Sequence, residues 1–433
     1  MISSIIFTLL LLTTFVVFGL RIRKIFGNVS LGKPFGRTDR PMERFILMCK
    51  VAIGQSKMVT RPISGILHIF IYVGFVIINI EILEIFIDGV LGSHRIFLPM
   101  MGESYALFLN IFEVLAILVI LACVVFLIRR NVIRLKRFWS AEMTSWPRSD
   151  ANIILVTEIL LMSAFLTMDA SDQILQSRGS AIYHETGNLF FSSMLSGLMS
   201  DMGTSSLIFI ERFTWWFHIV GIMAFMIYVP YSKHFHIFLA FPNVYYSNLE
   251  DKGKMNHLES VTAEVKLMMD PDVDPYANPP ETEEKAGRFG AKDVMDLDRK
   301  QLMDAYCCTE CGRCTSNCPA NQTGKLLSPR KIMMDTRDRL EAYGSSKNED
   351  KTLLFDYVSE EEIWACTTCN ACTEACPINI DPLSIIVDLR RYLVMEESKM
   401  PNELMTMSSN IENNGAPWQF AAVDRGNWVN EES

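Results

Sequence analysis

The sequence predicts an all-α protein in which a five-helix transmembrane bundle precedes a smaller helical domain. Long apolar runs crowd into the first 236 of the 433 residues, and half of all residues are hydrophobic. Helical periodicity returns over 294–306, 329–343 and 382–395, and no strand-like alternation of any length accompanies it. These observations favour two helical regions of opposite character, one in lipid and one in water.

Five apolar segments reach the roughly 20 residues that a membrane-spanning helix needs. They run over residues 2–20, 62–87, 106–128, 152–171 and 207–230. The first differs from a secretory signal, because no basic region precedes it and the cluster Arg21, Arg23 and Lys24 follows it. We therefore expect this segment to remain in the membrane.

The charges of the loops predict the orientation of the bundle. The loops 21–61 and 129–149 carry sixteen Lys and Arg residues, whereas the loops 88–105 and 172–206 carry two. Basic loops stay in the cytoplasm, so the N-terminus is expected outside and the chain after about residue 231 inside. Residues 41–55 could lie as a helix at the interface.

The chain after the bundle is acidic. Residues 237–433 carry 20 Lys and Arg against 34 Asp and Glu, a balance that argues against nucleic acid and for a protein or cofactor partner. Pro-rich acidic pieces at 271–275 and 279–284 are typical of a linker. The predicted parts are a membrane domain over 1–236, a connector over 237–300, a cysteine-rich domain over 301–400 and a tail over 401–433 that contacts another subunit.

Nine of the eleven cysteines fall between Cys307 and Cys376, and eight of them form two copies of one motif. Both copies read C-x2-C-x2-C-x3-C-P. A 4Fe-4S cubane needs four thiolates, and at this spacing three wrap one cluster while the fourth reaches the other. The first cysteine set is therefore Cys308, Cys311, Cys314 and Cys376, and the second cysteine set is Cys366, Cys369, Cys372 and Cys318.

Two structural zinc sites are the alternative, which the full repeat of the motif and its following proline disfavour. Cys307 stands outside the register and is expected not to bind iron, and Cys49 and Cys123 are expected to be buried and inert. Forty-seven residues with helix signals separate Cys318 from Cys366. This arrangement resembles the helical two-cluster ferredoxin domain of succinate dehydrogenase and heterodisulfide reductase subunits, which implies a conductor of single electrons.

Histidines in or beside the predicted spans are candidate ligands of a b-type haem. His68 lies in the second span and His218 in the fifth, while His234 and His236 follow its cytoplasmic end. An ionisable side chain in a bilayer is expensive and usually functional, and neutral imidazole is the usual axial ligand of haem b. The alternative for each is a hydrogen bond to a neighbouring helix or a position at the interface.

Five spans with histidines on the second and fifth resemble the cytochrome b subunit of respiratory nitrate reductase. The resemblance implies that His68 and His236, on the second and fifth helices, bind the cytoplasm-proximal haem and that His218 is one ligand of a distal haem. This sequence departs from that family at Ile78, where the second distal ligand would stand. We therefore expect one haem, held by His68 and His236, with His218 facing a quinone or a second haem.

Carboxylates in the spans are a weaker signal. Glu81, Glu84 and Glu113 lie toward the outer face, and Glu158 lies about 12 Å inside the fourth span by helix rise. They could deliver protons to a quinone, or simply face the bundle or the headgroups.

The whole chain resembles membrane-bound iron–sulfur oxidoreductases, namely the quinone-linked proteins that serve electron-transfer flavoprotein and the membranous heterodisulfide reductases. Further matches are Pro230-Tyr-Ser-Lys-His-Phe-His236 leading to Pro242-Asn-Val, and Asn414-Gly-Ala-Pro-Trp418 with Arg425-Gly-Asn-Trp428. The resemblance implies a bacterial or archaeal cytoplasmic membrane and menaquinone or ubiquinone as substrate. It also implies catalysis on a separate CCG-type iron–sulfur subunit, since this chain stops at Ser433, with electron-transfer flavoprotein as a further partner.

Two other functions remain open. The chain could oxidise quinol to drive thiol or disulfide reduction, or it could be a haem-free membrane anchor that only docks the ferredoxin domain.

Overall fold

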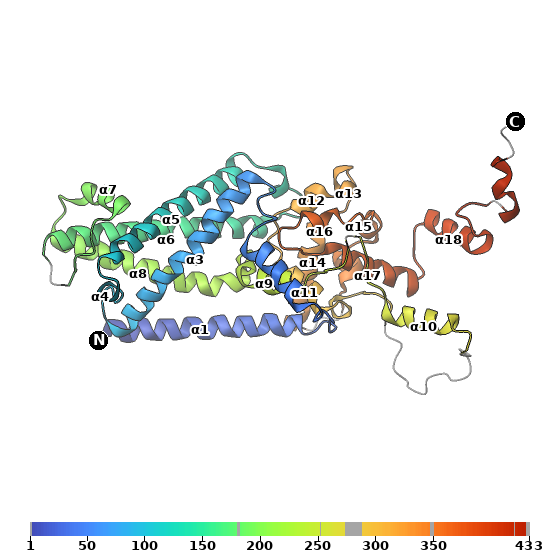
Figure 1. Cartoon of the computed structure of the whole chain (residues 1–433), viewed down its shortest axis with the longest axis horizontal. Coiled ribbons are helices and arrows are strands. Elements are labelled where there is room, and N and C mark those ends of the chain that lie inside the picture. The colour runs from blue at the N-terminus through green and yellow to red at the C-terminus, as the bar shows by residue number, and fades with distance from the viewer. Residues whose placement is uncertain are drawn as a thin grey trace.

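The computed structural model describes residues 2–179, 182–251, 253–272, 288–346, 350–419 and 421–429 (Figure 1). The molecule is elongated, with a bundle of long helices at one end and a group of short helices at the other. The Pro-rich residues 273–287 of the predicted connector lie outside the described residues.

Five helices are long and apolar enough to cross a membrane, as the sequence predicts. They are α1 (Ile2–Val29), α3 (Pro62–Leu91), α5 (Ser104–Leu127), α6 (Ser145–Ser177) and α8 (Thr204–Tyr228). Each is longer than the apolar run that predicts it. The 28 residues of α1 rise about 42 Å, more than the roughly 30 Å of a hydrocarbon core, so one end of α1 reaches beyond the membrane.

Helix α6 is the centre of the bundle. It packs against α5 on one side and α8 on the other, while α3 packs on α5 and α1 covers α3 and α8. Two short helices, α4 (Leu98–Met101) and α7 (Phe190–Met199), lie in the loops at the end that is remote from the cysteine domain (Figure 1). Many apolar side chains on the outer faces of the spans are exposed, as expected of helices that face lipid.

The loops at the other end connect the bundle to the cysteine domain. Helix α2 (Pro41–Met48) and the turn Cys49–Ile53 form the helix expected within 41–55. The connector expected over 237–300 opens with a helix, α9 (His236–Tyr245), which packs against α2 and α11.

The cysteine domain is built from short helices. They are α11 (Arg299–Cys307), α12 (Arg313–Asn317), α13 (Pro319–Gln322), α14 (Pro329–Ser346), α15 (Glu360–Trp364), α16 (Ala371–Ala375) and α17 (Pro382–Met395). Over the described ranges the backbone pairs only at two isolated bridges, Lys33 with Asp298 and Leu354 with Val358, and forms no strand. The helices predicted over 329–343 and 382–395 are confirmed.

The helix predicted over 294–306 is divided in two. Val294–Asp296 forms a separate 3-10 turn, and α11 begins only after Asp298. The Asp298 side chain accepts a hydrogen bond from the backbone N–H of Gln301, which is the cap that starts a new helix.

A single apolar core joins the cysteine domain to the membrane-proximal helices. Ile25 of α1, Leu239 and Val244 of α9, and Leu340 and Leu389 of α14 and α17 belong to the same buried cluster. The cysteine domain is therefore packed on the bundle and not merely tethered to it.

Polar contacts reinforce this junction. Arg21 of α1 pairs with Glu341 at 2.6 Å, and Asn28 donates to the hydroxyl of Tyr306 at 2.7 Å. A Cβ on Gly344 would overlap the side-chain oxygen of Asn28, so the close approach of α1 and α14 depends on that glycine.

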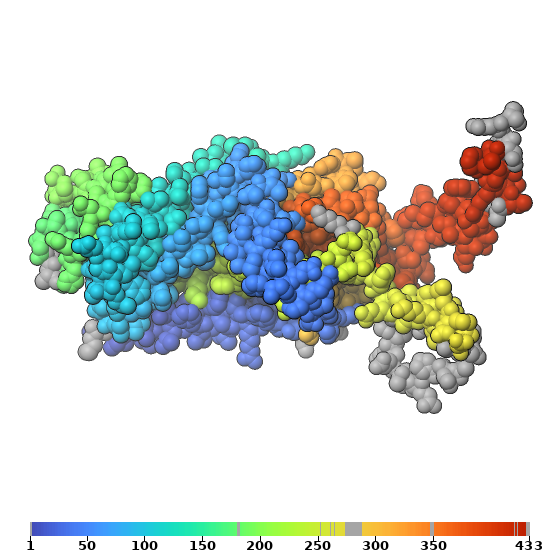
Figure 2. Space-filling view, in the orientation of Figure 1, coloured from blue at the N-terminus to red at the C-terminus, as the bar shows by residue number. Residues whose placement is uncertain are grey.

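Two helices project from the compact body (Figure 2). Helix α10 (Glu259–Met269) follows α9, and α18 (Asn402–Asn414) begins the C-terminal tail. Both carry exposed apolar side chains, among them Met268, Met269, Met405 and Ile411.

Candidate functional site

The two cysteine motifs adopt the same backbone conformation. In the first cysteine loop, residues 308–318, Glu310 and Gly312 have positive φ angles of 56° and 71°. In the second cysteine loop, residues 366–376, the equivalent Thr368 and Asn370 have φ angles of 53° and 62°. A short helix follows in each loop, α12 in the first and α16 in the second, and these two helices pack on each other. The motif therefore encodes one local structure twice.

The first cysteine set lines one pocket. Cys308, Cys311, Cys314 and Cys376 all lie on the wall of one hollow, together with Arg330, Met333 and Ile378. Three of the thiols come from the first loop and the fourth from the second, as the spacing predicts. The thiols surround a hollow, which suits a cluster that offers one iron to each of four thiolates.

Three members of the second cysteine set, Cys366, Cys369 and Cys372, lie on the second loop. The fourth, Cys318, directly follows α12, which packs on α16 of that loop. Cys318 and Cys372 are buried, but Cys369 is exposed. Among the described residues, no group of three or more His, Cys, Asp or Glu side chains lies close enough to hold a single metal ion.

Backbone N–H groups and cations surround the thiols. Thr368 donates its N–H to Cys366 Sγ and Ile380 donates to Cys376 Sγ, both at 3.4 Å. Burial raises the pKa of the thiols of Cys308 and Cys376 to about 12, so binding of iron there must displace protons. N–H donors around sulfur are the usual surroundings of an iron–sulfur cluster, and the residues present fit two such groups.

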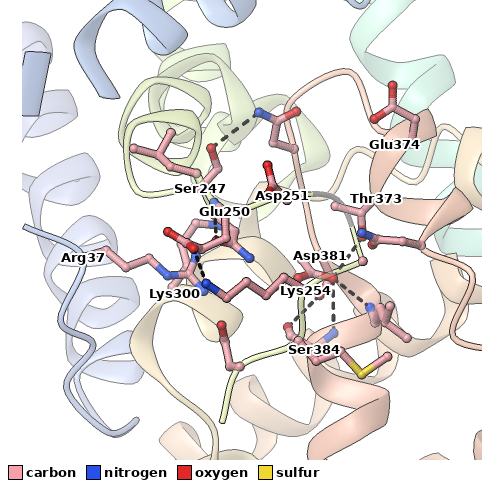
Figure 3. Close-up of a pocket in the computed structure, with 18 of the residues that line it drawn as sticks. Arg37, Ser247, Glu250, Asp251, Lys254, Lys300, Thr373, Glu374, Asp381 and Ser384 are labelled. Atoms are coloured by element: carbon pink, nitrogen blue, oxygen red, sulfur yellow. Dashed lines mark hydrogen bonds and ion pairs between the residues drawn. The ribbon is translucent and has the colours of Figure 1, made fainter. Parts of the chain in front are cut away.

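The second loop is held from its α17 side. Asp381 accepts a hydrogen bond from the Thr373 hydroxyl at 2.9 Å and from the backbone N–H groups of Leu383 and Ser384 (Figure 3). The same carboxylate therefore caps α17 and fixes the loop. Figure 3 shows the polar pocket beside these residues, where Lys254 pairs with Glu250 at 2.6 Å.

The remaining cysteines take no part in either set. Cys307 is buried, and it does not line the hollow of the first set. Cys123 is buried as expected, whereas Cys49, also expected to be buried, is only partly so, because α2 lies on the surface of the bundle.

Three histidines converge where the bundle meets the cysteine domain. The ring centroids of His68 and His236 lie 6.3 Å apart with an angle of 49° between the rings, and His234 lies 5.7 Å from His236. His236 donates from Nδ1 to the carbonyl of Lys233 at 3.0 Å, which leaves its Nε2 free for a metal. Buried His68 Nδ1 and His234 Nε2 have no hydrogen-bond partner among the described residues.

This arrangement fits an axial pair. Two metal–imidazole bonds of about 2 Å each, plus the inner half of each ring, separate the centroids by roughly 6 Å. Burial lowers the pKa of His236, which favours the neutral imidazole that binds a metal.

The fifth span does not carry His236, contrary to what the resemblance to the nitrate reductase subunit implies. Helix α8 ends at Tyr228, two short 3-10 turns follow, and His236 opens α9. Pro230 lies in the break, where it cannot donate the hydrogen bond that would continue the helix. This break turns His236 back toward His68 on α3.

His218 lies apart from that group. It is buried in α8, its Nδ1 lies 2.8 Å from the carbonyl of Leu161, and its ring faces Phe165 at 6.1 Å. Ile78 is buried in α3 and carries no ligand atom.

The first cysteine loop rests on the loops of the bundle. Lys233, three residues before His236, pairs with Glu310 at 2.5 Å, and Arg337 pairs with the same carboxylate at 2.9 Å. Although burial alone would raise the pKa of Glu310, the charges of Lys233 and Arg337 outweigh it and hold that pKa below its ordinary value.

Two arginines extend this contact. Arg313 donates to the carbonyls of Lys57 and Met58, each at 3.0 Å, and its charge acts on His68. Arg330 donates to the carbonyl of Arg137 at 2.6 Å. Sequence reasoning missed these residues, although Glu310 and Arg313 differ from Thr368 and Ala371 at the same places in the second loop, a difference that could have singled them out.

The carboxylates at the far end of the bundle face its interior. Glu84 accepts from the N–H of Phe97 and the hydroxyl of Tyr105, and Glu113 accepts from two backbone N–H groups at the start of α7. Buried Arg95, which the sequence shows only as a loop charge, pairs with Asp169 and Asp172 at 2.7 Å each.

The comparisons with known proteins agree with the cysteine geometry. Residues 304–380 match the family model described as a 4Fe-4S dicluster domain. The chain is similar to the probable iron-sulfur-binding oxidoreductase FadF of Bacillus subtilis, with 28% identity over 93% of this chain and 57% of the relative. It is also similar to the EtfAB:quinone oxidoreductase of Syntrophomonas wolfei, with 28% identity over 91% of this chain and 55% of the relative.

A shorter similarity covers the cysteine domain. One subunit of the ferredoxin/F(420)H(2)-dependent CoB-CoM heterodisulfide reductase of Methanosarcina acetivorans is 33% identical over 26% of this chain and 60% of the relative. The chain spans about half the length of the two longer relatives, and no solved structure matches it. The chain thus carries a 4Fe-4S dicluster domain behind five apolar helices and is related to iron–sulfur oxidoreductases.

Proposed function

We propose that the chain is a membrane-bound electron-transfer subunit that moves electrons between a partner in the cytoplasm and the quinone pool. The proposal rests on the junction between the helix bundle and the cysteine domain. The first cysteine loop and the pair His68–His236 meet there, and Lys233, which pairs with Glu310, lies three residues from His236.

The cofactors of this proposal are two 4Fe-4S clusters and one haem b. The first cysteine set holds one cluster, the second cysteine set holds the other, and His68 and His236 hold the haem. When bound, these groups supply one-electron redox chemistry. The protein supplies thiolates and imidazoles on packed helices, and Cys308 of the first set is buried.

Burial gives the two cysteine sets different positions on the electron path. Exposed Cys369 makes the second set the one that a soluble partner can approach. We place the first set between the second set and the histidines, because Arg313 of its loop donates to the carbonyl of Lys57 in the loop that leads into α3, whereas Cys369 of the second set is exposed. The proposed order is partner, second set, first set, histidine pair and quinone.

The proposed partners follow from the resemblance and from the names of the relatives. One relative is called an EtfAB:quinone oxidoreductase, which supports electron-transfer flavoprotein as a partner, directly or through a CCG-type iron–sulfur subunit. Menaquinone or ubiquinone is the proposed substrate on the membrane side.

The orientation proposed from loop charges places the cysteine domain in the cytoplasm. Lys57, Arg61 and Arg137 of the two basic loops contact the cysteine domain or lie near its first loop. Basic loops and cysteine domain therefore share one side, which supports the proposed topology.

Haem retention in single histidine variants tests the proposal. We expect the dithionite-reduced wild-type chain to show b-type α-bands, and His68→Ala and His236→Ala to lose them. His257→Ala, at an exposed histidine, is the matched control and should retain the spectrum. His234→Ala tests the third member of the group, and we expect it to retain haem because His236 remains.

Two results would reject this proposal. If the wild-type chain shows no b-type bands, the bundle is a haem-free anchor. If His68→Ala and His236→Ala both retain the full spectrum, the haem uses another pair.

A second function has one observation in its favour. The cysteine domain is similar to a subunit of a heterodisulfide reductase, so electrons could flow from quinol toward a disulfide-reducing partner. Anaerobic mixing separates the two directions. Reduction of the clusters by a naphthoquinol faster than by reduced electron-transfer flavoprotein would favour quinol oxidation.

A further inference from the structure

A cavity of about 250 Å³ lies in the bundle beside the histidines. Its walls come from α1, α3, α5, α6, α8 and α9, and nearly all of the residues on them are apolar. Phe75 and Phe238 on its wall are 37% and 50% exposed, so the cavity opens to the surface of the molecule. A concave site with an apolar lining and a few polar groups is typical of a small-molecule site.

Aromatic rings connect this cavity to the candidate haem ligands. Phe75 and Phe225 both line it, and their centroids lie 6.3 and 5.4 Å from that of His234. His234 in turn lies 5.7 Å from His236. A redox-active ring in the cavity would therefore lie close to the histidine pair.

Two polar side chains face the cavity, Glu158 of α6 and Asn79 of α3. Asn79 donates its amide N–H to the carbonyl of Phe75 on its own helix. Glu158 makes no hydrogen bond or ion pair with any residue in the described part of the chain. An unpaired carboxyl group in a hydrocarbon region is costly, so its presence on this wall calls for a ligand.

We propose that the cavity binds the head group of a membrane quinone, with the Glu158 carboxyl hydrogen-bonded to one ring oxygen. A carboxylic acid can donate to a quinone carbonyl, and a carboxylate can accept from a quinol hydroxyl. The apolar walls contact the ring and the start of the isoprenoid chain, whose remainder leaves through the lipid-facing mouth. The inference rests on the function proposed above and gives it a site.

A second haem is the competing occupant. The resemblance to the nitrate reductase subunit would place a distal haem near Ile78, which lines this cavity. His218, the one histidine available at that level among the described residues, does not line it, and its Nδ1 contacts the carbonyl of Leu161. The described walls of the cavity therefore offer a haem no axial ligand.

Two matched pairs of variants test the proposal in the full purified chain. Ile82 lines the cavity and Ile80 on the same helix is exposed toward lipid, so Ile82→Trp fills the site and Ile80→Trp is its control. Glu158→Leu removes the hydrogen-bonding group, while Glu158→Gln keeps one. The probe is a fluorescent hydroxyquinoline N-oxide, an analogue of quinol, titrated by the quenching of its emission.

We expect Ile82→Trp to raise the dissociation constant of the probe at least tenfold and Ile80→Trp to leave it unchanged. Glu158→Leu should raise it by roughly tenfold, the equivalent of one lost hydrogen bond, and Glu158→Gln by less. The b-type spectrum and the cluster signals should stay at wild-type levels in all four variants.

Several outcomes would overturn the assignment. Wild-type affinity in both Ile82→Trp and Glu158→Leu would place quinone elsewhere, and equal loss in Ile80→Trp would show a general disturbance of the bundle. Loss of b-type bands in Ile82→Trp would identify the occupant as a porphyrin. Failure of the proposed function can be distinguished from failure of this assignment. If the wild-type chain shows no haem bands but the four variants still change probe binding as expected, the haem proposal is wrong and the quinone site stands.

Discussion

The two cysteine loops have the same backbone conformation but contact different parts of the molecule. Both have the same spacing and the same pair of positive φ angles, yet Glu310 and Arg313 of the first loop contact the bundle, where the second loop has Thr368 and Ala371. The cysteines of such a motif specify how iron is held. The residues between them specify which side of the domain faces the membrane.

The largest predicted effect concerns the fourth thiolate of the first set, which comes from the second loop. Cys376 belongs to the second loop by sequence but lines the hollow of the first set. We expect Cys376→Ala to abolish the cluster held by Cys308, Cys311 and Cys314 and so to remove the four irons of that cluster from each chain. Iron analysis and electron paramagnetic resonance measure this. Cys307→Ala, at a buried cysteine outside both sets, should change neither.

The next prediction concerns the buried carboxylate that only the first loop has. Glu310→Gln leaves Lys233 and Arg337 without their common counter-charge, and breaking a buried pair in this way costs about 3–5 kcal/mol. Thr368→Ala, at the equivalent position of the second loop, should cost less than about 0.5 kcal/mol. Denaturant unfolding followed by cluster absorbance compares them, and similar losses would contradict the asymmetry of the loops.

A smaller effect is expected from the arginine that anchors the first loop. Arg313→Ala removes the hydrogen bonds to the carbonyls of Lys57 and Met58, so the free energy of local opening there should fall by about 1–3 kcal/mol. Hydrogen exchange of residues 54–61 measures this fall. Ala371→Ser in the second loop is the control, and protection unchanged in Arg313→Ala would show that the anchor lies elsewhere.

The smallest effect concerns pH at the junction that supports the first loop. Burial alone would raise the pKa of Glu341, but hydrogen bonds from Arg21 and Tyr306 hold it below its ordinary value. The carboxylate therefore stabilises the fold above an unfolded pKa of about 4.3, and this contribution is lost as pH falls through the lower folded pKa. Unfolding free energies between about pH 3 and 7 should show this slope in the wild type and not in Glu341→Gln.

The sequence predicts the elements of the fold better than their contacts. The five spans and the helices at 329 and 382 follow from apolar length and helical periodicity, which are local properties. The membership of the first cysteine set follows from spacing alone. The spans and helices need no knowledge of residues distant in the chain, whereas the first set joins Cys376 to three cysteines of the other loop.

Contacts between residues that are distant in the chain could not be predicted from the sequence. Neither the pair Lys233–Glu310 nor the hydrogen bond from Asn28 to Tyr306 has a local signal. The end of the fifth span near residue 230 follows from hydropathy, but the turn after Tyr228 that brings His236 back toward the bundle has no local signal. Its effect is large, since the break decides which helix presents His236 to His68.

Cysteines from both loops line the hollow of the first set, and this has a consequence for biosynthesis. Cys376 is synthesised 62 residues after Cys314, when all five spans have left the ribosome. The first three thiols of the set therefore lack their fourth partner until the second loop has been synthesised and has packed against the first. If the two ligand sets are as proposed, iron insertion is tied to completion of the domain, and we expect a chain truncated before Cys376 to lack the cluster of the first set.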